Sequence, residues 1–189
     1  MSNLPEYLRM RANATPNPKN TVTLGDVRIT VITPRLIRIE QGAFTDEATT
    51  VVLCRSFYDC DIRTEQSGDT TILHTGALTL SYAAGQPLET LLIRAEQAPG
   101  FIWHYGQKPL QNLKGTTSTL DCVDGACPLE DGLCAIDGYA LLDDSASCLM
   151  TGDGWFASPP PARMCTSSAT VTITKPASAT FTAFPAQRP

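Results

Sequence analysis

The sequence predicts an all-β fold. Short runs rich in valine, isoleucine, leucine and threonine recur at intervals of about 8–12 residues, a spacing typical of antiparallel sandwiches and barrels. Gly-Asp, Asp-Gly and Gly-Gln-Pro turn signals separate these runs. No stretch of about twelve residues carries an apolar stripe at helical spacing.

The elements can be predicted in order along the chain. Residues 1–20 are polar and contain several prolines, so they predict a loose lead-in with one helical turn near Tyr7. The predicted strands then cover residues 22–31 with a hairpin turn at Gly25-Asp26, followed by 36–39, 51–53, 71–73, 78–82, 91–93, 139–142 and 147–150. The last two strands predict a closing hairpin around Asp143-Asp144-Ser145. We therefore expect one antiparallel β domain over residues 21–156.

The tail has a different composition from the rest of the chain. Residues 162–189 contain no Asp or Glu, are rich in Thr, Ser, Ala and Pro, and show almost no alternation. Such a composition predicts a disordered end, which we assign to residues 157–189.

Charge and hydropathy exclude two classes of partner. The net charge of −5 argues against nucleic-acid binding, which requires a basic face. No apolar run is long enough for a transmembrane helix, so no membrane association is predicted. The first twenty residues lack the apolar core of a secretory signal, and the predicted location is therefore the cytoplasm.

The cysteines favour free thiols over disulfides or a metal centre. There are seven cysteines, an odd number, and no Cys-x-x-Cys motif occurs. Cys122, Cys127 and Cys134 come closest to a ligand set, but their spacing is wrong for zinc and both histidines lie elsewhere. We therefore predict buried thiols in a reducing compartment, with no metal site and no cofactor.

Residues 111–144 form the most distinctive segment. They combine glycines, short apolar pairs and three Asp-Gly turns, and such a long ordered run of turns usually shapes a site or an interface. Paired carboxylates can serve as the acid and nucleophile of a glycosidase. However, an Asp beside Gly is normally a turn residue, and we favour that role for most of these acids. The available carboxylates are Asp121, Asp124, Glu130, Asp131, Asp137, Asp143 and Asp144.

Other candidate chemistry is weaker. Trp103, His104 and Tyr105 are candidates for a sugar-stacking platform, although aromatic residues at a strand end more often belong to a core or an interface. His74 lies in a strand-like run. Neither histidine has a Ser or Cys nearby in a nucleophile motif, so a catalytic triad is not predicted.

An ordered series of motifs resembles the N-terminal domain of family 31 glycoside hydrolases, the α-glucosidase and α-xylosidase group. The family pattern runs roughly NLGGTxRTLD, then DGxxPLExGLLSRDGW, then an apolar strand and DDS, with a DGW before the catalytic barrel. The matching segments here are 112–117, 119–121, 124–125, 128–130, 132–133, 137–139, 142–145 and 153–155. The resemblance covers about residues 21–155.

The resemblance implies a galactose-mutarotase-like β-sandwich that packs on a (β/α)8 barrel. In the family, that barrel carries the aspartate nucleophile and the acid/base, so no catalytic residue is expected in this chain. The sandwich lends a loop to the substrate pocket, and the loop's aspartate corresponds to Asp137. This chain departs from the pattern at Ile136, Tyr139, Lys114 and Ser118, where the family has Arg, Trp, Gly and Arg. Substrate contact by Asp137 and a plain turn role both remain open.

The tail also departs from the family, which continues after its DGW with a segment like DxYLFGYGHDYKxCL. An amino acid largely fixes the first two bases of its codon, so a shifted reading frame can be tested from the protein sequence. When the third base of each codon is joined to the first two bases of the next, with bases chosen among those that the genetic code permits, residues 162–189 can be read as ADVYLFGYGHDYKACLSDFYRLSGPTP. We therefore expect a frameshift between about residues 155 and 162 to have replaced the start of the barrel with out-of-frame sequence.

These observations predict a non-catalytic N-terminal β-sandwich of a family 31 α-glycosidase. The resemblance implies that the parent enzyme hydrolyses α-linked oligosaccharides or glycosides by the retaining route with two carboxylates. Two alternatives remain: a stand-alone carbohydrate-binding module, and an interaction module that docks on a separately encoded barrel.

Overall fold

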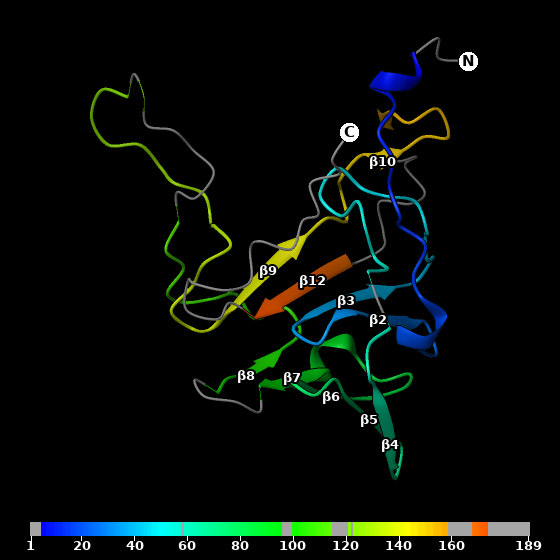
Figure 1. The fold of residues 1–189 in the computed structure, drawn as a ribbon. Helices are drawn as coiled ribbons and strands as arrows, with labels where there is room; N and C mark the ends of the chain where they lie inside the picture. Colours follow the sequence, from blue (N-terminus) through cyan, green and yellow to red (C-terminus); the bar gives the residue numbers. More distant parts are fainter. Residues whose placement is uncertain are drawn as a thin grey trace.

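The computed structural model describes residues 5–57, 59–95, 100–114, 121 and 123–158, together with the backbone of 168–173. The fold is mostly β, every ladder between strands is antiparallel, and no α-helix occurs in these parts of the chain (Figure 1). Three short 3-10 turns are present: η1 (Glu6–Leu8), η2 (Pro18–Asn20) and η3 (Leu88–Thr90).

The first sheet has five strands and joins segments from both ends of the chain. Its order is β1 (Thr21–Leu24), β2 (Val27–Thr33), β3 (Leu36–Gln41), β12 (Ser168–Ile173) and β9 (Tyr139–Asp143). The predicted hairpin turn at Gly25-Asp26 connects β1 to β2, and Gly25 has the positive φ of 65° that such a turn requires.

The second sheet is a simple meander. Its strands follow chain order: β4 (Arg63–Ser67), β5 (Thr70–His74), β6 (Leu78–Ala83), β7 (Leu92–Ala95) and β8 (Ile102–His104). Tight connections such as Gly68-Asp69 between β4 and β5 match the turn signals in the sequence. A separate two-stranded sheet pairs β10 (Leu149–Met150) with β11 (Phe156–Ala157).

One hydrophobic cluster lies between the two large sheets. Alternate residues of β2 and β3, such as Ile29 and Ile39, meet Leu80, Ile93 and other apolar residues of the meander. Strand β6 has the clearest pattern, because its buried and partly exposed residues alternate along its whole length. The fully buried Trp103 on β8 belongs to the same cluster.

Two predictions about secondary structure were wrong. Residues 51–53 form no strand, and Val52 is instead buried in a segment that covers the face of the first sheet opposite the core. Residues 147–150 do not pair with β9. Leu149 and Met150 pair with β11 because the chain turns at Asp144, whose side chain is buried and whose carbonyl accepts a bond from the Ser147 N–H.

The tail prediction also needs correction at six residues. Ser168–Ile173 form strand β12 in the middle of the first sheet, where disorder was expected. The physical reason is visible in the sequence Thr-Val-Thr-Ile, since β-branched residues favour extended backbone. Residues 159–167 and 174–189 lie outside the described part of the chain.

Candidate functional site

The distinctive segment of the sequence projects from the sheets as an arm. We call residues 108–114 and 132–139 the ribbon arm; its two sides lead out from β8 and back into β9 (Figure 1). The Leu113 N–H donates to the Cys134 carbonyl at 2.9 Å, and the Ile136 N–H donates to the Gln111 carbonyl at 3.0 Å. These bonds make the arm an ordered antiparallel ribbon.

Asn112 clamps the two sides of the arm together with its side-chain amide. Its Oδ1 accepts from the backbone N–H of Gly132 and of Lys114, both at 2.8 Å, and its Nδ2 donates to the Gly132 carbonyl at 2.9 Å. Lys114 has a φ of 52°, which is a left-handed conformation that favours glycine. The clamp therefore holds a backbone shape that the side chain of Lys114 does not favour.

Asp137 lies at the turn where the arm returns to β9. Its Oδ2 accepts a hydrogen bond of 2.7 Å from the Gln111 N–H, on the opposite side of the arm. The next residue, Gly138, has a φ of 85°, as the predicted Asp-Gly turn requires. The turn role of Asp137 is thus present. Since an ionised carboxylate can accept about four hydrogen bonds, this single bond leaves capacity for a ligand.

Tyr139 anchors the base of the arm in the hydrophobic core. Its ring is buried and lies 5.2 Å from the ring of Phe101, centroid to centroid. Its hydroxyl donates to the Lys108 carbonyl at 3.3 Å, and burial, followed by the charge of Asp137, raises the pKa of this hydroxyl. Tyr139 therefore fills a core position and also ties the two sides of the arm.

The arm presents apolar side chains to solvent. Leu110 is 87% exposed, Ile136 is 67% exposed and Leu113 is 59% exposed. Contiguous exposed apolar residues often mark a surface that contacts another molecule or domain, so the arm is a candidate for such a surface.

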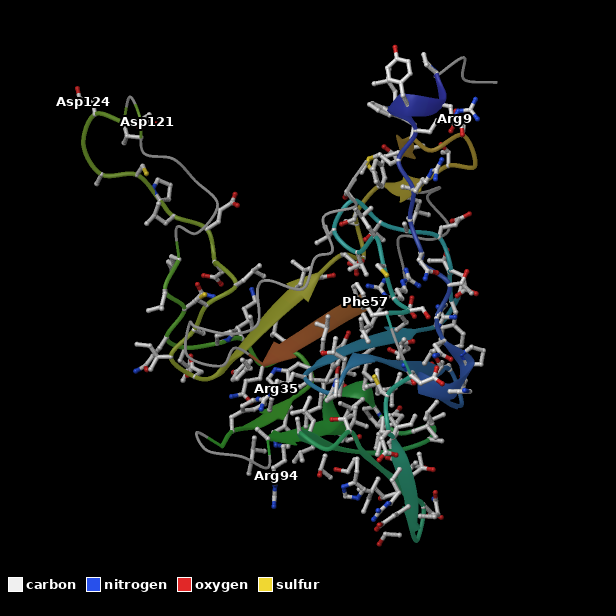
Figure 2. All side chains as sticks on the ribbon, in the orientation of Figure 1. Arg9, Arg35, Phe57, Arg94, Asp121 and Asp124 are labelled. Carbon is white, nitrogen blue, oxygen red and sulfur yellow. The ribbon has the colours of Figure 1, made fainter. Side chains whose placement is uncertain are left out.

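The predicted acids do not gather into one site. Asp121 and Asp124 lie at the far end of the loop that the arm carries (Figure 2), whereas Asp137 lies at the turn into β9. Asp131 lies 3.9 Å from the Lys114 ammonium group. Asp143 accepts a bond from the Ser145 N–H, and Asp144 is buried against Arg38. A glycosidase pair within this segment is therefore not supported, and the turn interpretation fits most of these acids.

The aromatic platform is also not formed. Trp103 is 0% exposed, belongs to the core cluster and donates from its Nε1 to the Gln107 carbonyl at 2.7 Å. Tyr105 packs edge-on against it at 5.8 Å between ring centroids. His74 contacts the Thr79 hydroxyl from its Nδ1 at 3.2 Å. The core interpretation of Trp103 is confirmed, and the stacking interpretation is wrong.

The described cysteines are free thiols. Cys60 is buried, and desolvation by burial raises the pKa of its thiol, with a smaller contribution from Asp59. Cys54, Cys127, Cys134 and Cys148 are only partly buried, so the prediction of buried thiols holds for Cys60 alone. Cys122 and Cys165 fall outside the described residues. Within those residues no three His, Cys, Asp or Glu side chains are grouped to hold a metal ion.

Sequence reasoning missed a buried ionic cluster on the first sheet. Glu40 on β3 is 4% exposed and lies among three arginines. Its Oε2 accepts from Arg28 Nε at 2.8 Å, its Oε1 lies 3.3 Å from Arg38 Nε, and Arg55 Nη1 donates to Oε1 at 3.5 Å. The signal was present as charged residues alternating with the apolar ones of β2 and β3, a pattern that ordinarily indicates a solvent-facing side.

The segment around residues 44–56 covers this cluster, and Asp46 of this segment together with Asp144 balances the charge of the arginines. Arg28 pairs with Asp46 at 2.7 Å, and Arg38 makes a two-pronged pair with Asp144 at 2.8 and 2.9 Å. Arg55 donates to the carbonyls of Thr45 and Glu47, at 2.6 and 2.9 Å. Burial and the neighbouring arginine charge lower the pKa of Arg55 to about 10, so it remains protonated at neutral pH. The cluster therefore fixes the covering segment to the sheet, which is a structural role.

An open hollow lies between the N-terminal segment and the β10–β11 turn. Arg9, Arg11 and Met150 are among its lining residues, and the Met10 N–H donates to the Gly154 carbonyl at 3.2 Å. Gly154 has a φ of 77°, and a Cβ there would lie 2.9 Å from the Cβ of Arg9. Only glycine fits this position, so the Asp-Gly-Trp motif fixes where the N-terminal segment crosses.

No helix among the residues that the structure describes is long and apolar enough to cross a membrane. When the chain was compared with family models and with curated proteins, neither comparison found a match.

Proposed function

We propose that this chain is the non-catalytic N-terminal β-sandwich of a family 31 α-glycosidase, with a galactose-mutarotase-like topology. In this proposal the ribbon arm packs on a (β/α)8 barrel and forms one wall of its pocket for an α-linked oligosaccharide or glycoside. Asp137 contacts the substrate. The chemistry belongs to the barrel, and the chain alone hydrolyses nothing.

The observation that carries the proposal is the ribbon arm. It is ordered by Asn112 and Asp137, yet it exposes Leu110, Leu113 and Ile136. A free-standing domain gains nothing from holding such residues in water, whereas a docking wall needs them.

Backbone conformation supports the family assignment independently of the strand pattern. Lys114 occupies the position of a family glycine and has a positive φ. Gly138 and Gly154, each of which follows an aspartate, also have positive φ values, and Gly154 has no room for a side chain. At these three positions, where the family pattern has glycine, the backbone conformation also favours it.

Two assays test the catalytic part of the proposal. The chain alone should release no product from a chromogenic α-glucoside above a blank without protein. Turnover above that blank would refute it. Saturable binding of maltose by the chain in calorimetry, abolished by Asp137→Ala, would instead support a stand-alone carbohydrate-binding module.

Association with a barrel tests the docking part. A family 31 barrel produced without its own N-terminal domain should bind this chain, and the complex should sediment as one species. Leu113→Asp and Ile136→Asp should weaken binding at least about tenfold, because each buries a charge in the contact. Ile102→Asp is the matched control, since Ile102 is also half exposed but lies on β8. Equal effects of all three changes would contradict docking through the arm.

The role of Asp137 is tested in the same complex. Asp137→Asn keeps an acceptor for the Gln111 N–H and removes the charge, so the arm should keep its shape. We expect the KM for an α-glucoside to rise while association with the barrel is unchanged. Asp124→Asn, at the far end of the loop, should change neither quantity (Figure 2). An unchanged KM in the Asp137 variant would leave that residue with its turn role alone.

The docking interpretation also covers the alternative of an interaction module for a separately encoded barrel. The exposed apolar side chains favour it over a sugar-binding module, because Trp103 is in the core and Tyr105 packs against it, so the two do not form an exposed stacking platform.

A further inference from the structure

Strand β12 occupies a space that is one strand wide. We call the space between β3 and β9 the strand slot. β12 is antiparallel to both neighbours, with Thr170 opposite Arg38 on one side and Leu142 on the other. Since adjacent strands lie about 4.8 Å apart, β3 and β9 are about 10 Å apart and cannot hydrogen-bond each other directly. Removing β12 would leave two unpaired edges that face each other.

The core side of β9 is held in place without β12. Tyr139 is buried in the shared hydrophobic cluster and contacts Phe101, and Leu141 packs against the same cluster. These contacts join β9 to the opposite sheet.

The other side of the slot is closed by an ion pair. Arg38 on β3 donates from Nη1 to both carboxylate oxygens of Asp144, the residue that follows β9. Thr49 in the covering segment donates to the same carboxylate at 2.9 Å. The strands on either side of β12 are therefore linked through side chains that do not belong to β12.

Strand β12, which fills the strand slot, is the last strand of the first sheet in chain order. Every other strand of that sheet lies before residue 144, and residues 159–167 separate β12 from the rest. An extended segment gains its affinity for such a slot from backbone hydrogen bonds on both edges, and the same segment from another copy offers identical bonds.

We propose that the slot between β3 and β9 is a preformed acceptor for a single extended strand, and that Ser168–Ile173 of a second copy fills it by exchange. The inserted strand restores all five strands in each copy, so the cost of exchange is that of rearranging the connecting segment and of associating two chains. This inference concerns the first sheet and is independent of the function proposed for the arm.

The first test uses the full chain with Val171→Pro and a fluorescent peptide of residues 166–175. Proline at 171 removes a ladder N–H and is not tolerated in the middle of a central strand, so the variant's own segment leaves the slot. We expect saturable peptide binding to the variant in fluorescence anisotropy. Binding to the unchanged chain should be at least about 100-fold weaker, because its own segment competes at a high effective concentration.

A control peptide that itself carries Val171→Pro should bind neither protein. If the Val171→Pro chain does not fold alone, the unmodified peptide should restore its cooperative unfolding transition in a concentration-dependent manner. Absence of both binding and rescue would overturn the proposal. So would equal binding of the two peptides.

The second test is sedimentation of the full chain over a wide concentration range. The unchanged chain should form a dimer whose fraction rises with concentration, and the free peptide should dissociate that dimer. The Val171→Pro chain should not dimerise, since it has no strand to donate. Exchange between copies would be overturned if the Val171→Pro chain formed a dimer. It would also be overturned if the unchanged chain stayed monomeric at every concentration.

Discussion

Two polar networks join segments that lie far apart in the chain, one of them buried and the other exposed. Around Glu40, three arginines face Glu40, Asp46 and Asp144 on the covered side of the first sheet. Around Asp59, the ammonium group of Lys19 lies 2.5 Å from one carboxylate oxygen and the Asn17 amide donates to the other at 2.7 Å. Both networks therefore tether a loop by charge-assisted hydrogen bonds.

The difference lies in what happens when one partner is lost. A charge left alone in the buried network has no water to replace its partner, so the cost includes its desolvation. A charge left alone at Asp59 is hydrated at once, because both side chains are mostly exposed. The same bond lengths thus predict very different energies, and burial decides between them.

The largest expected effect comes from Glu40→Gln. This change removes the charge that faces Arg28, Arg38 and Arg55 while it keeps the side-chain volume. Breaking a buried pair in this way costs about 3–5 kcal/mol, so the urea midpoint should fall sharply at an unchanged m-value. Glu47→Gln is the control, because Glu47 is exposed and only its backbone carbonyl binds Arg55. A similar midpoint for both variants would contradict the importance of the buried network.

Replacing a whole pair should cost less than breaking it. Asp144→Leu alone leaves the Arg38 guanidinium without its two-pronged partner, and we expect a loss of about 3 kcal/mol or more. Adding Arg38→Met should recover at least about 1 kcal/mol, because the cluster regains its charge balance. Urea unfolding of the two single variants and the double variant gives this coupling. Strict additivity would mean that Arg38 and Asp144 do not act as a unit.

The sequence predicted the parts of the fold that obey local rules. The Gly25-Asp26 hairpin and the alternating strand at 78–82 follow from turn chemistry and from burial on one face, and both are present. The strand predicted at residues 51–53 is absent, because an apolar run can pack over a sheet as well as join it. In this chain the nearby residue Arg55 donates to carbonyls of the same segment, which helps to hold the segment over the sheet.

The site was predictable only in part. The Asp-Gly turn at Asp137 was recognisable from two residues, and its bond to Gln111 completes the arm. The ionic cluster was not, because Arg28 and Glu40 are twelve positions apart and each looks like an ordinary polar residue of an edge. Their burial depends on a covering segment whose path is set by long-range contacts. Substrate contact by Asp137 stays a prediction.

An intermediate effect on stability is expected at Asn112, whose side chain is less buried than Glu40 and less exposed than Lys19. Asn112→Ala removes the acceptor for the Gly132 and Lys114 amides on an arm that is largely exposed. We expect a loss of about 1 kcal/mol or less in global stability, but much faster hydrogen exchange at Gly132. Asn112→Asp should protect Gly132 better than alanine does, since it restores the acceptor. Unchanged exchange at Gly132 in the alanine variant would show that the backbone ribbon holds the arm alone.

The smallest effect on stability is expected at the exposed pair. The hydrogen bond from Lys19, then that from Asn17, lowers the pKa of Asp59 below its usual value. A carboxylate with a lowered pKa in the folded state stabilises the fold above its unfolded pKa, and this contribution is lost as the pH falls through the folded pKa. Lys19→Met should therefore raise the pKa of Asp59 in a carbonyl-detected NMR titration, as should added salt, while the urea midpoint at neutral pH should fall only slightly because the pair is exposed. If Lys19→Met instead lowered that midpoint as much as Glu40→Gln does, burial would not be what separates the two networks.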